Sequence, residues 1–466
     1  MYHMTSIGNE QQAEVEGIVS RFFEARGTLV YLISNENGVT EALSPERFAI
    51  GEYVRMKGRL EFRGEKAQLV CEQVERVEGK KAAEVVEKAE SGAKLANAKL
   101  FLDNETMQKL VPEMQKAARK LLAAKLLGRQ VILRYNNDAD GISAGIGVAS
   151  VLRPAKFSAV QHNSAIYNTA DALRDISALR GAFAPLLILV DFGANVESVE
   201  ALAIVKSAGI EILIVDHHPP ASCAHELASV FVTPWRAGAA SEYPAGLLCC
   251  EIAKIAGVEA GRMDAVSRIS LTGDKSRLYS PDEEDERKAL ALDFLATYAN
   301  FANTLEFFES VLTDEGLLAQ IVGQAREKME NIAKMAGDYA REKQVGGFKV
   351  YLIGLDKLAK HNEFPSRGKI TGAYFDSVKK EGEPTIVIGH GERLISFRAN
   401  SAARDAGFNA TRLIEELKSE LRDGIESGGG HDVAASLRIT KEFEKIVLEE
   451  VLKKIEKQGS TSAHGS

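Results

Sequence analysis

The chain has 466 residues, of which 45% are hydrophobic and 27% are charged, and its formal net charge is −8. These values predict a soluble globular protein of about three domains. The negative charge excludes binding of nucleic acid through overall charge alone. A polyanion would have to be held by local basic surface, with bound cations neutralising any acidic centre.

Cysteine content and hydropathy indicate the compartment. The four cysteines form no Cys-x-x-Cys pair, which argues against a structural zinc site. Cys249 and Cys250 are adjacent in an apolar run and are expected to be buried thiols in a reducing environment. No apolar run approaches the roughly 18 residues of a membrane span, and the first residues lack the apolar core of a signal peptide. We therefore expect a cytoplasmic protein with no membrane partner.

Residues 1–79 are predicted to form a small β-barrel that resembles an OB-fold. Short apolar stretches alternate there with glycine-containing turns, at a spacing typical of such barrels. Arg55, Lys57 and Arg59 alternate with other residues and are expected on one face of a strand. This basic face could bind single-stranded nucleic acid, or it could be a solvated surface over an aromatic core. The sequence leaves both interpretations open.

The rest of the chain predicts an α/β protein. Residues 80–128 are rich in Ala, Lys, Glu and Leu, which favours a helical connector. Over 129–343, strand and helix patterns alternate as in a doubly wound parallel sheet, and the last part is typical of long amphipathic helices. A smaller C-terminal α/β domain is expected over 344–458. Residues 459–466 contain no core-forming residues and are expected to be a disordered tail.

Three apolar strands of the doubly wound domain are followed by polar residues. The strands at 131–133, 186–190 and 212–215 lead into Asn-Asn-Asp-Ala-Asp-Gly, Asp-Phe-Gly and Asp-His-His. Because ligands bind beyond the carboxyl ends of parallel strands, these side chains are expected to converge at one edge. Asp274, which follows a helical stretch, is a further candidate. The candidate catalytic and metal-binding residues are Asp138, Asp140, Asp191, Asp216, His217, His218 and Asp274.

The residue types of this site indicate the ion that it would bind. Carboxylates are hard oxygen donors, and imidazole shifts the preference towards Mn²⁺, so the set suits Mn²⁺ or Mg²⁺. Several carboxylates at one edge cannot all stay ionised without cations. Two ions about 3.5–4 Å apart would satisfy them, as in phosphoesterases.

These motifs resemble those of a known family. Asp138-x-Asp140-Gly, Asp191-x-Gly, the Asp-His-His at 216–218 and Asp274 occur in the order of the four motifs of the DHH phosphoesterases. The Gly-Gly-Gly-His segment at 428–431 resembles the glycine-rich motif of the DHH-associated C-terminal domain. With an OB-like barrel in front, the chain is most similar to archaeal RecJ-like exonucleases.

The resemblance implies an activity and its partners. It implies a Mn²⁺- or Mg²⁺-dependent exonuclease that hydrolyses single-stranded DNA or RNA by two-metal activation of water. Such a protein would act in DNA replication or repair, and replication or repair proteins are candidate partners. It also implies that Arg398 and a loop formed by Gly428, Gly429, Gly430 and His431 bind the nucleic-acid backbone, because main-chain N–H groups of glycine approach phosphate closely.

The resemblance also implies a role for each residue of the metal site. Asp191 would bridge the two ions, and Asp138 would hold the first. Asp140, His217 and Asp274 would hold the second. His218 and Asp216, which complete the Asp-His-His motif, would respectively contact the scissile phosphate and orient the imidazoles.

Asn136 departs from the family pattern, in which His or Asp precedes Asp138 by two residues. A neutral amide oxygen can ligate a hard cation but adds no charge, so the first ion is expected to bind more weakly. Two alternatives therefore stay open. One is a catalytically weakened scaffold of a replication complex, as in the replicative-helicase cofactor branch of the family. The other is a phosphodiesterase of short oligonucleotides or cyclic dinucleotides.

Overall fold

The computed structural model describes the chain except for residues 1–2, 8–9, 26, 64–65, 80–81, 298–303, 359–363, 392 and 463–466. The chain forms two compact units. The first comprises residues 1–289 and 304–309, and the second comprises residues 290–303 and 310–466. None of the helices in the described part of the chain combines the length and the apolar character of a membrane span.

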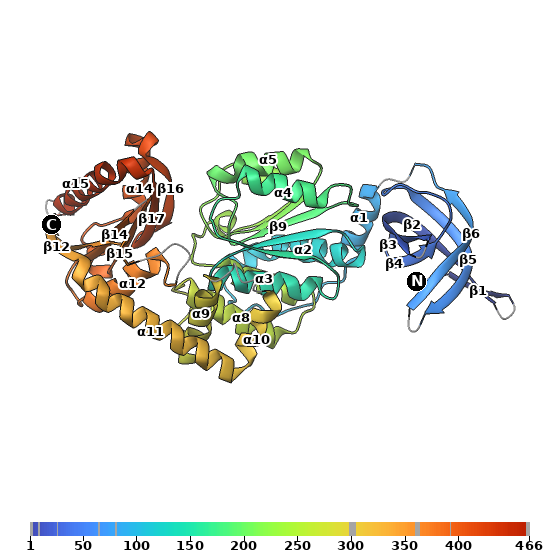
Figure 1. Cartoon of the computed structure of the whole chain (residues 1–466), viewed down its shortest axis with the longest axis horizontal. Coiled ribbons are helices and arrows are strands. Elements are labelled where there is room, and N and C mark those ends of the chain that lie inside the picture. The colour runs from blue at the N-terminus through green and yellow to red at the C-terminus, as the bar shows by residue number, and fades with distance from the viewer. Residues whose placement is uncertain are drawn as a thin grey trace. The chain divides into compact units, whose positions relative to one another are not determined.

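A closed β-barrel of five strands begins the first unit (Figure 1). The strands follow the order β2-β3-β4-β6-β5, and β5 pairs with β2 to close the barrel. All neighbours are antiparallel except β4 and β6. The inward side chains, among them Val15, Ile33 and Met56, are buried, and the predicted OB-like barrel is confirmed. The barrel strands are β2 (Glu10–Ala25), β3 (Thr28–Asn35), β4 (Gly38–Leu43), β5 (Tyr53–Arg63) and β6 (Lys66–Arg76), and β1 (His3–Ile7) pairs with β2 outside the closed ring.

Two helices connect the barrel to the sheet that follows. They are α1 (Ala82–Gly92) and α2 (Glu105–Leu126). Ile18 of the barrel packs in one apolar cluster with Val85 of α1. Lys120 of α2 is buried and pairs with Glu90 of α1 at 2.6 Å and with Glu211 at the start of β10 at 2.7 Å. The connector therefore holds barrel and sheet together through both apolar and charged contacts.

A five-stranded sheet forms the centre of the first unit, with the order β11-β10-β9-β7-β8 and all strands parallel. Helices α4 and α5 cover one face, while α2, α3 and α7 cover the other (Figure 1). Every residue of β9 is buried, as expected for a central parallel strand. The elements are β7 (Val131–Asn136), α3 (Ala139–Leu152), β8 (Ser158–His162), α4 (Thr169–Leu179), β9 (Leu186–Val190), η1 (Val196–Ser198), α5 (Val199–Ser207), β10 (Glu211–Val215), α6 (Ala224–Leu227), β11 (Val230–Val232), η2 (Pro234–Ala237), α7 (Ala245–Ile255) and α8 (Ala260–Gly273).

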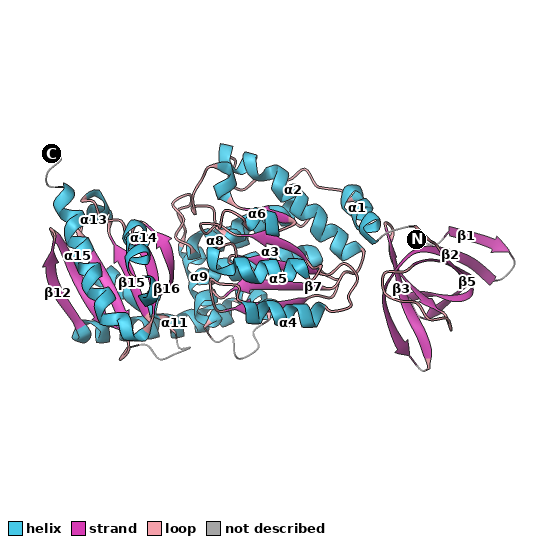
Figure 2. Ribbon diagram, turned by 90° about the horizontal axis from the view of Figure 1, so that it is seen from above, coloured by secondary structure: helices cyan, strands magenta, loops and turns pink. Residues whose placement is uncertain are grey.

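The second unit contains a mixed sheet with the order β12-β13-β14-β15-β17-β16. Helices α14 and α15 cover one face (Figure 2), and α11 and α12 pack on the other. The α/β class with a further C-terminal α/β domain is thus confirmed. The elements from residue 283 onwards are α9 (Glu283–Ala296), α10 (Leu305–Thr313), α11 (Glu315–Tyr339), β12 (Ala340–Val345), β13 (Phe348–Gly354), α12 (Arg367–Val378), β14 (Thr385–Gly391), β15 (Leu394–Ala399), α13 (Ser401–Asp405), α14 (Ala410–Glu420), η4 (Arg422–Gly424), β16 (Ile425–His431), β17 (Ala434–Ile439), η5 (Lys441–Phe443) and α15 (Glu444–Ser462).

The long helix α11 packs within the second unit. Ala336 of α11 lies in an apolar cluster with Ile353 of β13 and Ile370 of α12. From its sequence pattern, this helix is predicted to lie in the domain of residues 129–343. A helical pattern alone does not show which sheet the apolar side of the helix covers. By its contacts, α11 belongs to the second unit, which therefore begins before residue 343. The predicted domain limits otherwise stay a prediction.

Candidate metal centre

The polar residues that follow β7, β9 and β10 meet at one edge of the parallel sheet. Val190 at the end of β9 is in register with Tyr135 of β7 and Val215 of β10. The residues that follow these three strands therefore leave the sheet side by side. The backbone N–H of Asp191 donates to the carbonyl oxygen of Val215 at 2.9 Å, which extends the pairing by one residue. The pairing of the backbone strands alone thus brings these motifs together.

Asp191 is the most constrained acid of the site. It is buried and has a φ of +67°, in the left-handed region. Its Oδ2 accepts from Nδ2 of Asn136 at 3.3 Å, whereas Oδ1 accepts no hydrogen bond from any residue that the structure describes. Burial, followed by repulsion from Asp140 and Asp138, raises the pKa of Asp191 well above its usual range. A buried carboxylate oxygen that accepts no well-aligned hydrogen bond from the described residues is typical of an atom whose partner is a bound ion or water.

His217 faces that oxygen with a nitrogen that can bind an ion. Its Nδ1 lies 2.9 Å from the carbonyl oxygen of Ser241, which only accepts, so Nδ1 carries a proton. In the neutral ring Nε2 then presents a lone pair, 3.3 Å from Oδ1 of Asp191. Burial alone would lower the pKa of His217, but Asp274 and then Asp191 outweigh it and raise the pKa well above its ordinary value. The site therefore attracts a positive charge to Nε2.

A divalent cation fits this arrangement. Asp191, His217 and His218 offer ligand atoms that all lie within 4.8 Å of one another. A lone pair of imidazole and an unpaired carboxylate oxygen repel each other unless a proton or a metal ion lies between them. Oxygen and imidazole donors without a thiolate suit Mn²⁺ or Mg²⁺. The residues present are thus compatible with the ion that the sequence predicts.

Asp216 orients the second imidazole. Its Oδ1 accepts from the backbone N–H of His218 at 3.0 Å and from Nδ1 of His218 at 2.9 Å. Its Oδ2 accepts from the backbone N–H of Ala194 at 3.1 Å. Burial would raise the pKa of Asp216, but attraction to His218 outweighs it and lowers the pKa. Because Nδ1 is the donor, Nε2 of His218 remains available, and 41% of this side chain is exposed. His217, in contrast, is held by Ser241 and not by Asp216.

Asp140 has a structural function that the sequence did not reveal. Its Oδ2 accepts from the backbone N–H of Ala245 at 2.9 Å, and its Oδ1 from that of Gly246 at 2.8 Å. The hydroxyl of Ser270 also donates to Oδ1, at 2.5 Å. The carboxylate therefore caps the first turn of α7 and joins it to α3 and α8. Oδ2 is also 3.8 Å from Nε2 of His217, so Asp140 borders the proposed ion site.

Asn136 lies between two of the predicted ligands. Its Nδ2 donates to Oδ2 of Asp138 at 2.9 Å and to Oδ2 of Asp191 at 3.3 Å. The amide thus occupies a position between these carboxylates that a cation could take. Rotating the amide by half a turn would instead present its oxygen to an ion. Gly141 permits this close packing, since a Cβ there would lie 2.5 Å from the carbonyl oxygen of Asn136.

Asp274 approaches the site from the other edge of the imidazole. It follows α8, and its Oδ2 is 3.8 Å from Nδ1 of His217. Burial raises the pKa of Asp274 to about 7, against the opposing effect of His217. Asp140 faces Nε2 and Asp274 faces Nδ1. That Asp140, His217 and Asp274 hold one ion together stays a prediction.

The basic face predicted for the barrel is balanced by acids. Arg55, Lys57 and Arg59 all lie on β5, and each forms an ion pair with a glutamate of a neighbouring strand. The pairs include Arg55–Glu16 at 2.9 Å, Lys57–Glu14 at 3.2 Å and Arg59–Glu72 at 2.8 Å. Because these charges are already compensated, the face offers less attraction to a polyanion than the sequence suggested. Contact of these three residues with nucleic acid stays a prediction.

The predicted substrate residues of the second unit lie on two strands of one sheet. Arg398 of β15 donates to the carbonyl oxygen of Phe397 at 2.8 Å, and burial lowers its pKa. Residues 428–431 form most of the edge strand β16, although a loop was expected. Glycine is required at 430, where φ is +135° and a Cβ would lie 2.6 Å from the carbonyl oxygen of Ala434. The glycines therefore serve close strand packing as well as any ligand.

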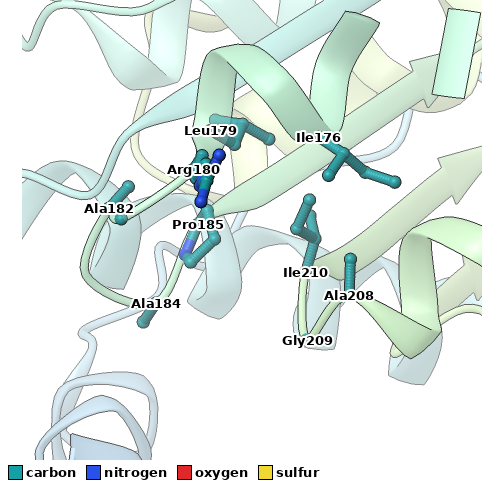
Figure 3. Close-up of a pocket in the computed structure, with 10 residues that line it drawn as sticks. Ile176, Leu179, Arg180, Ala182, Ala184, Pro185, Ala208, Gly209 and Ile210 are labelled. Carbon is teal, nitrogen blue, oxygen red and sulfur yellow. The ribbon is translucent and has the colours of Figure 1, made fainter. Parts of the chain in front are cut away.

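A pocket of the first unit lies at the opposite edge of the parallel sheet (Figure 3). It is formed where α4 ends and where the chain enters β9 and β10. The residues that line it are Ile176, Leu179, Arg180, Gly181, Ala182, Ala184, Pro185, Ala208, Gly209 and Ile210. Apart from Arg180 they are apolar residues and glycines, so this pocket does not belong to the metal centre.

Comparison with known proteins identifies the domain around the site. Residues 130–262 match the N-terminal domain of the DHH family. The chain carries a DHH-family domain. The matched range contains the candidate residues from Asn136 to His218, while Asp274 lies beyond it. The predicted DHH-family domain is thereby confirmed over these residues.

Relatives of the DHH-domain protein extend the comparison. A solved DHH domain, described as coming from a member of a family of ribosomal proteins, is 25% identical. That match has a TM-score of 0.71 and covers 81% of this chain and 98% of the other. RecJ from Thermus thermophilus, solved in complex with Mn²⁺, shares the fold at 15% identity and a TM-score of 0.50, over 78% of this chain and 56% of RecJ. An uncharacterized protein of Methanocaldococcus jannaschii is 25% identical over 93% of this chain and 67% of its own length.

Sequence reasoning missed the residues that support the ligands. The carbonyl oxygen of Ser241 fixes the tautomer of His217, and Nε1 of Trp235 donates to the backbone oxygen of His217 at 2.9 Å. Backbone acceptors leave no signature in a sequence. Trp235, however, follows the last strand of the sheet at the edge where the motifs converge, and this position could have indicated it.

Proposed function

We propose that this DHH-domain protein is a divalent-metal-dependent phosphodiesterase, and more specifically a RecJ-like exonuclease of single-stranded DNA or RNA. The observation that carries the proposal is Oδ1 of Asp191, which accepts no well-aligned hydrogen bond from the described residues and faces Nε2 of His217 at 3.3 Å at a buried sheet edge. The family of the domain, the fold shared with RecJ and the suitability of the donor set for Mn²⁺ or Mg²⁺ support it.

Each residue has a task in this proposal. Asp191, His217 and His218 would hold the ion, with Asp138 and Asp140 close enough to take part. Divalent ions in such sites activate water and neutralise the charge that develops on phosphate oxygens. Asp216 holds His218 with Nδ1 as donor, which leaves its exposed Nε2 for the ion or for a phosphate oxygen. Burial of Asp191 and His217 keeps the ligands away from bulk water.

Asp191→Asn is the variant that tests the metal site most directly. Asparagine tolerates the left-handed backbone of this position better than alanine does, so the fold is expected to persist. Removing the charge should lower Mn²⁺-dependent hydrolysis of a single strand by at least about 100-fold, as for the loss of one transition-state contact. Labelling the strand separately at each end reports activity and polarity together, and a dinucleotide substrate tests the preference for length.

Stability measurements give the matching control. Replacing a buried carboxylate by an amide should leave the melting temperature of the metal-free protein equal or higher, since burial and repulsion oppose the ionised form. The same variant should lose the stabilisation that Mn²⁺ gives to the wild type. Hydrolysis at the wild-type rate by this variant, with contaminating nuclease excluded, would refute the proposal.

A second candidate is a replication-complex scaffold without hydrolytic activity. Asn136 favours it, because its Nδ2 already satisfies Oδ2 of both Asp138 and Asp191. A scaffold would bind single-stranded nucleic acid without hydrolysing it at any Mn²⁺ or Mg²⁺ concentration. The end-labelled assay separates the two candidates.

A further inference from the structure

The segment from Thr233 to Tyr243 encloses the first histidine of the Asp-His-His motif. Nε1 of Trp235 donates to the backbone oxygen of His217, and the backbone oxygen of Ser241 accepts from its Nδ1. Main chain and imidazole of one residue are thus both held by the same segment. The hydrogen bond to His217 therefore fixes the position of the Trp235 ring relative to the metal centre.

Trp235 combines this attachment with an exposed ring. It is the single tryptophan of the chain, and 38% of it is exposed, although an indole of this size would contribute more to stability if it were buried. Its polar N–H is already used, so the accessible part of the ring is an apolar surface. Aromatic rings displayed in this way bind the flat faces of nucleobases.

Arg236 follows Trp235 in η2 and adds a cation to this segment. Its side chain is exposed and forms no hydrogen bond or ion pair with any residue in the described part of the chain. This distinguishes it from the arginines of the barrel face, which are paired with glutamates. An uncompensated guanidinium on the residue that follows an exposed tryptophan offers both contacts that a single strand needs, one for a base and one for a phosphate.

We propose that Trp235 and Arg236 form a nucleotide-binding subsite beside the metal centre. The indole stacks on a base of a single strand, and the guanidinium binds a backbone phosphate. The proposal rests on the proposed function in that it assigns the same substrate class, but it concerns binding and not hydrolysis. The tether to His217 sets the position of the bound nucleotide relative to the ligands.

Fluorescence of Trp235 tests the subsite without any turnover. A single strand of about 20 thymidylates is titrated into the full-length protein in EDTA, and binding is followed in parallel by anisotropy of a label on the strand. Stacking should quench the indole emission along the same saturation curve as the anisotropy. Anisotropy that rises without quenching would overturn the proposal, since the strand would then bind elsewhere.

Variants separate stacking from mere support of the fold. Trp235→Phe keeps a ring but loses the N–H, whereas Trp235→Leu loses both. We expect Trp235→Phe to bind within about threefold of the wild type and Trp235→Leu to bind at least about tenfold more weakly, as for the loss of one base stack. Equal impairment of both variants would indicate that only the hydrogen bond to His217 matters and would overturn the proposal.

Arg236→Gln should weaken binding and lower the slope of log affinity against log salt concentration by about 0.7, the value of one phosphate contact on a single strand. Arg180→Gln, an arginine at the opposite edge of the sheet, is the matched control and should leave both unchanged. An unchanged slope in Arg236→Gln would exclude the phosphate contact. If quenching occurs but no strand is ever hydrolysed, the subsite stands and the hydrolase proposal fails. If a strand is hydrolysed but binding causes no quenching, the hydrolase proposal stands and the subsite fails.

Discussion

The amide of Asn136 lies between the carboxylates of Asp138 and Asp191. Asn136→Asp should lower the Mn²⁺ concentration for half-saturation by about tenfold, because a carboxylate replaces a neutral group next to Asp138 and Asp191. Isothermal titration calorimetry at fixed pH measures this directly. In the metal-free state the same change adds a negative charge to an acidic cluster and should lower the melting temperature.

Asn137→Asp supplies the matched control, since it places the same new charge one residue further along the chain. Only Asn136→Asp should strengthen the binding of Mn²⁺. Equal effects of the two variants would mean that general negative charge, and not a ligand at 136, governs the affinity. An unchanged affinity in Asn136→Asp would show that this side chain does not reach the ion.

The cluster of buried acids and imidazole also predicts how stability depends on pH. Burial raises the pKa of Asp274 to about 7, and the pKa values of Asp191 and His217 are raised as well. The folded metal-free protein therefore binds more protons than the unfolded chain between about pH 4 and about pH 7. By linkage, this contribution to stability is complete at the acidic end of that range and is lost as the pH rises.

Calorimetry in EDTA from about pH 5 to about pH 8 should therefore show a falling melting temperature. Saturating Mn²⁺ should remove most of this fall, because an ion replaces the protons that the cluster otherwise retains. Asp274→Asn should flatten the profile of the metal-free protein. A melting temperature that rises over this range in EDTA would contradict the assignment.

At the level of the elements, the sequence predicted what strong patterns encode. The apolar strand β9 and the acid that follows it were predicted together, because a run of five apolar residues is typical of a buried parallel strand. The order of strands that brings Asp191 to His217 follows from the parallel topology. The glycine-rich segment at 428–431 was expected to be a loop, because glycine has low strand propensity, yet its pairing with β17 makes it a strand. Tertiary contact overrides local preference there.

Hydrogen bonds between distant elements could not be predicted in the same way. Asp140 caps α7 across more than a hundred residues of chain, and nothing near Ala245 or Ser270 indicates an acidic partner. Its motif suggested a metal ligand alone. The structure shows that one carboxylate can both fix a helix and border an ion site, so a loss of activity on its removal has two possible causes.

Unfolding in urea without metal distinguishes these causes. Asp140→Ala leaves two backbone N–H groups and the hydroxyl of Ser270 without an acceptor, and should lower the free energy of unfolding by about 3 kcal/mol. Asp138→Ala removes a cap from α3, where Oδ1 accepts from Gly141, and should cost about 1 kcal/mol. If both variants lose the same stability, the bonds of Asp140 to α7 contribute no more than an ordinary cap.

At the level of the whole molecule, the candidate functional residues are divided between the two units. The candidate ligands of the ion lie in the first unit, and Arg398 and the glycine-rich strand lie in the second. The sequence indicated both regions through their motifs. It could not show that α11 packs in the second unit, because Ala336 becomes a core residue only through side chains that follow it in the sequence.

This division predicts two unfolding transitions that metal affects differently. Trp235 is the single tryptophan and lies beside His217, so its fluorescence reports the first unit, whereas far-ultraviolet circular dichroism reports both. An ion that binds only the folded first unit stabilises it by about 2.7 kcal/mol at a concentration a hundred times its dissociation constant. The fluorescence midpoint should therefore rise with Mn²⁺, while part of the dichroism change stays at its metal-free midpoint. If the two signals coincide and move together, the chain unfolds as one cooperative body, and the predicted independence of the two units is wrong.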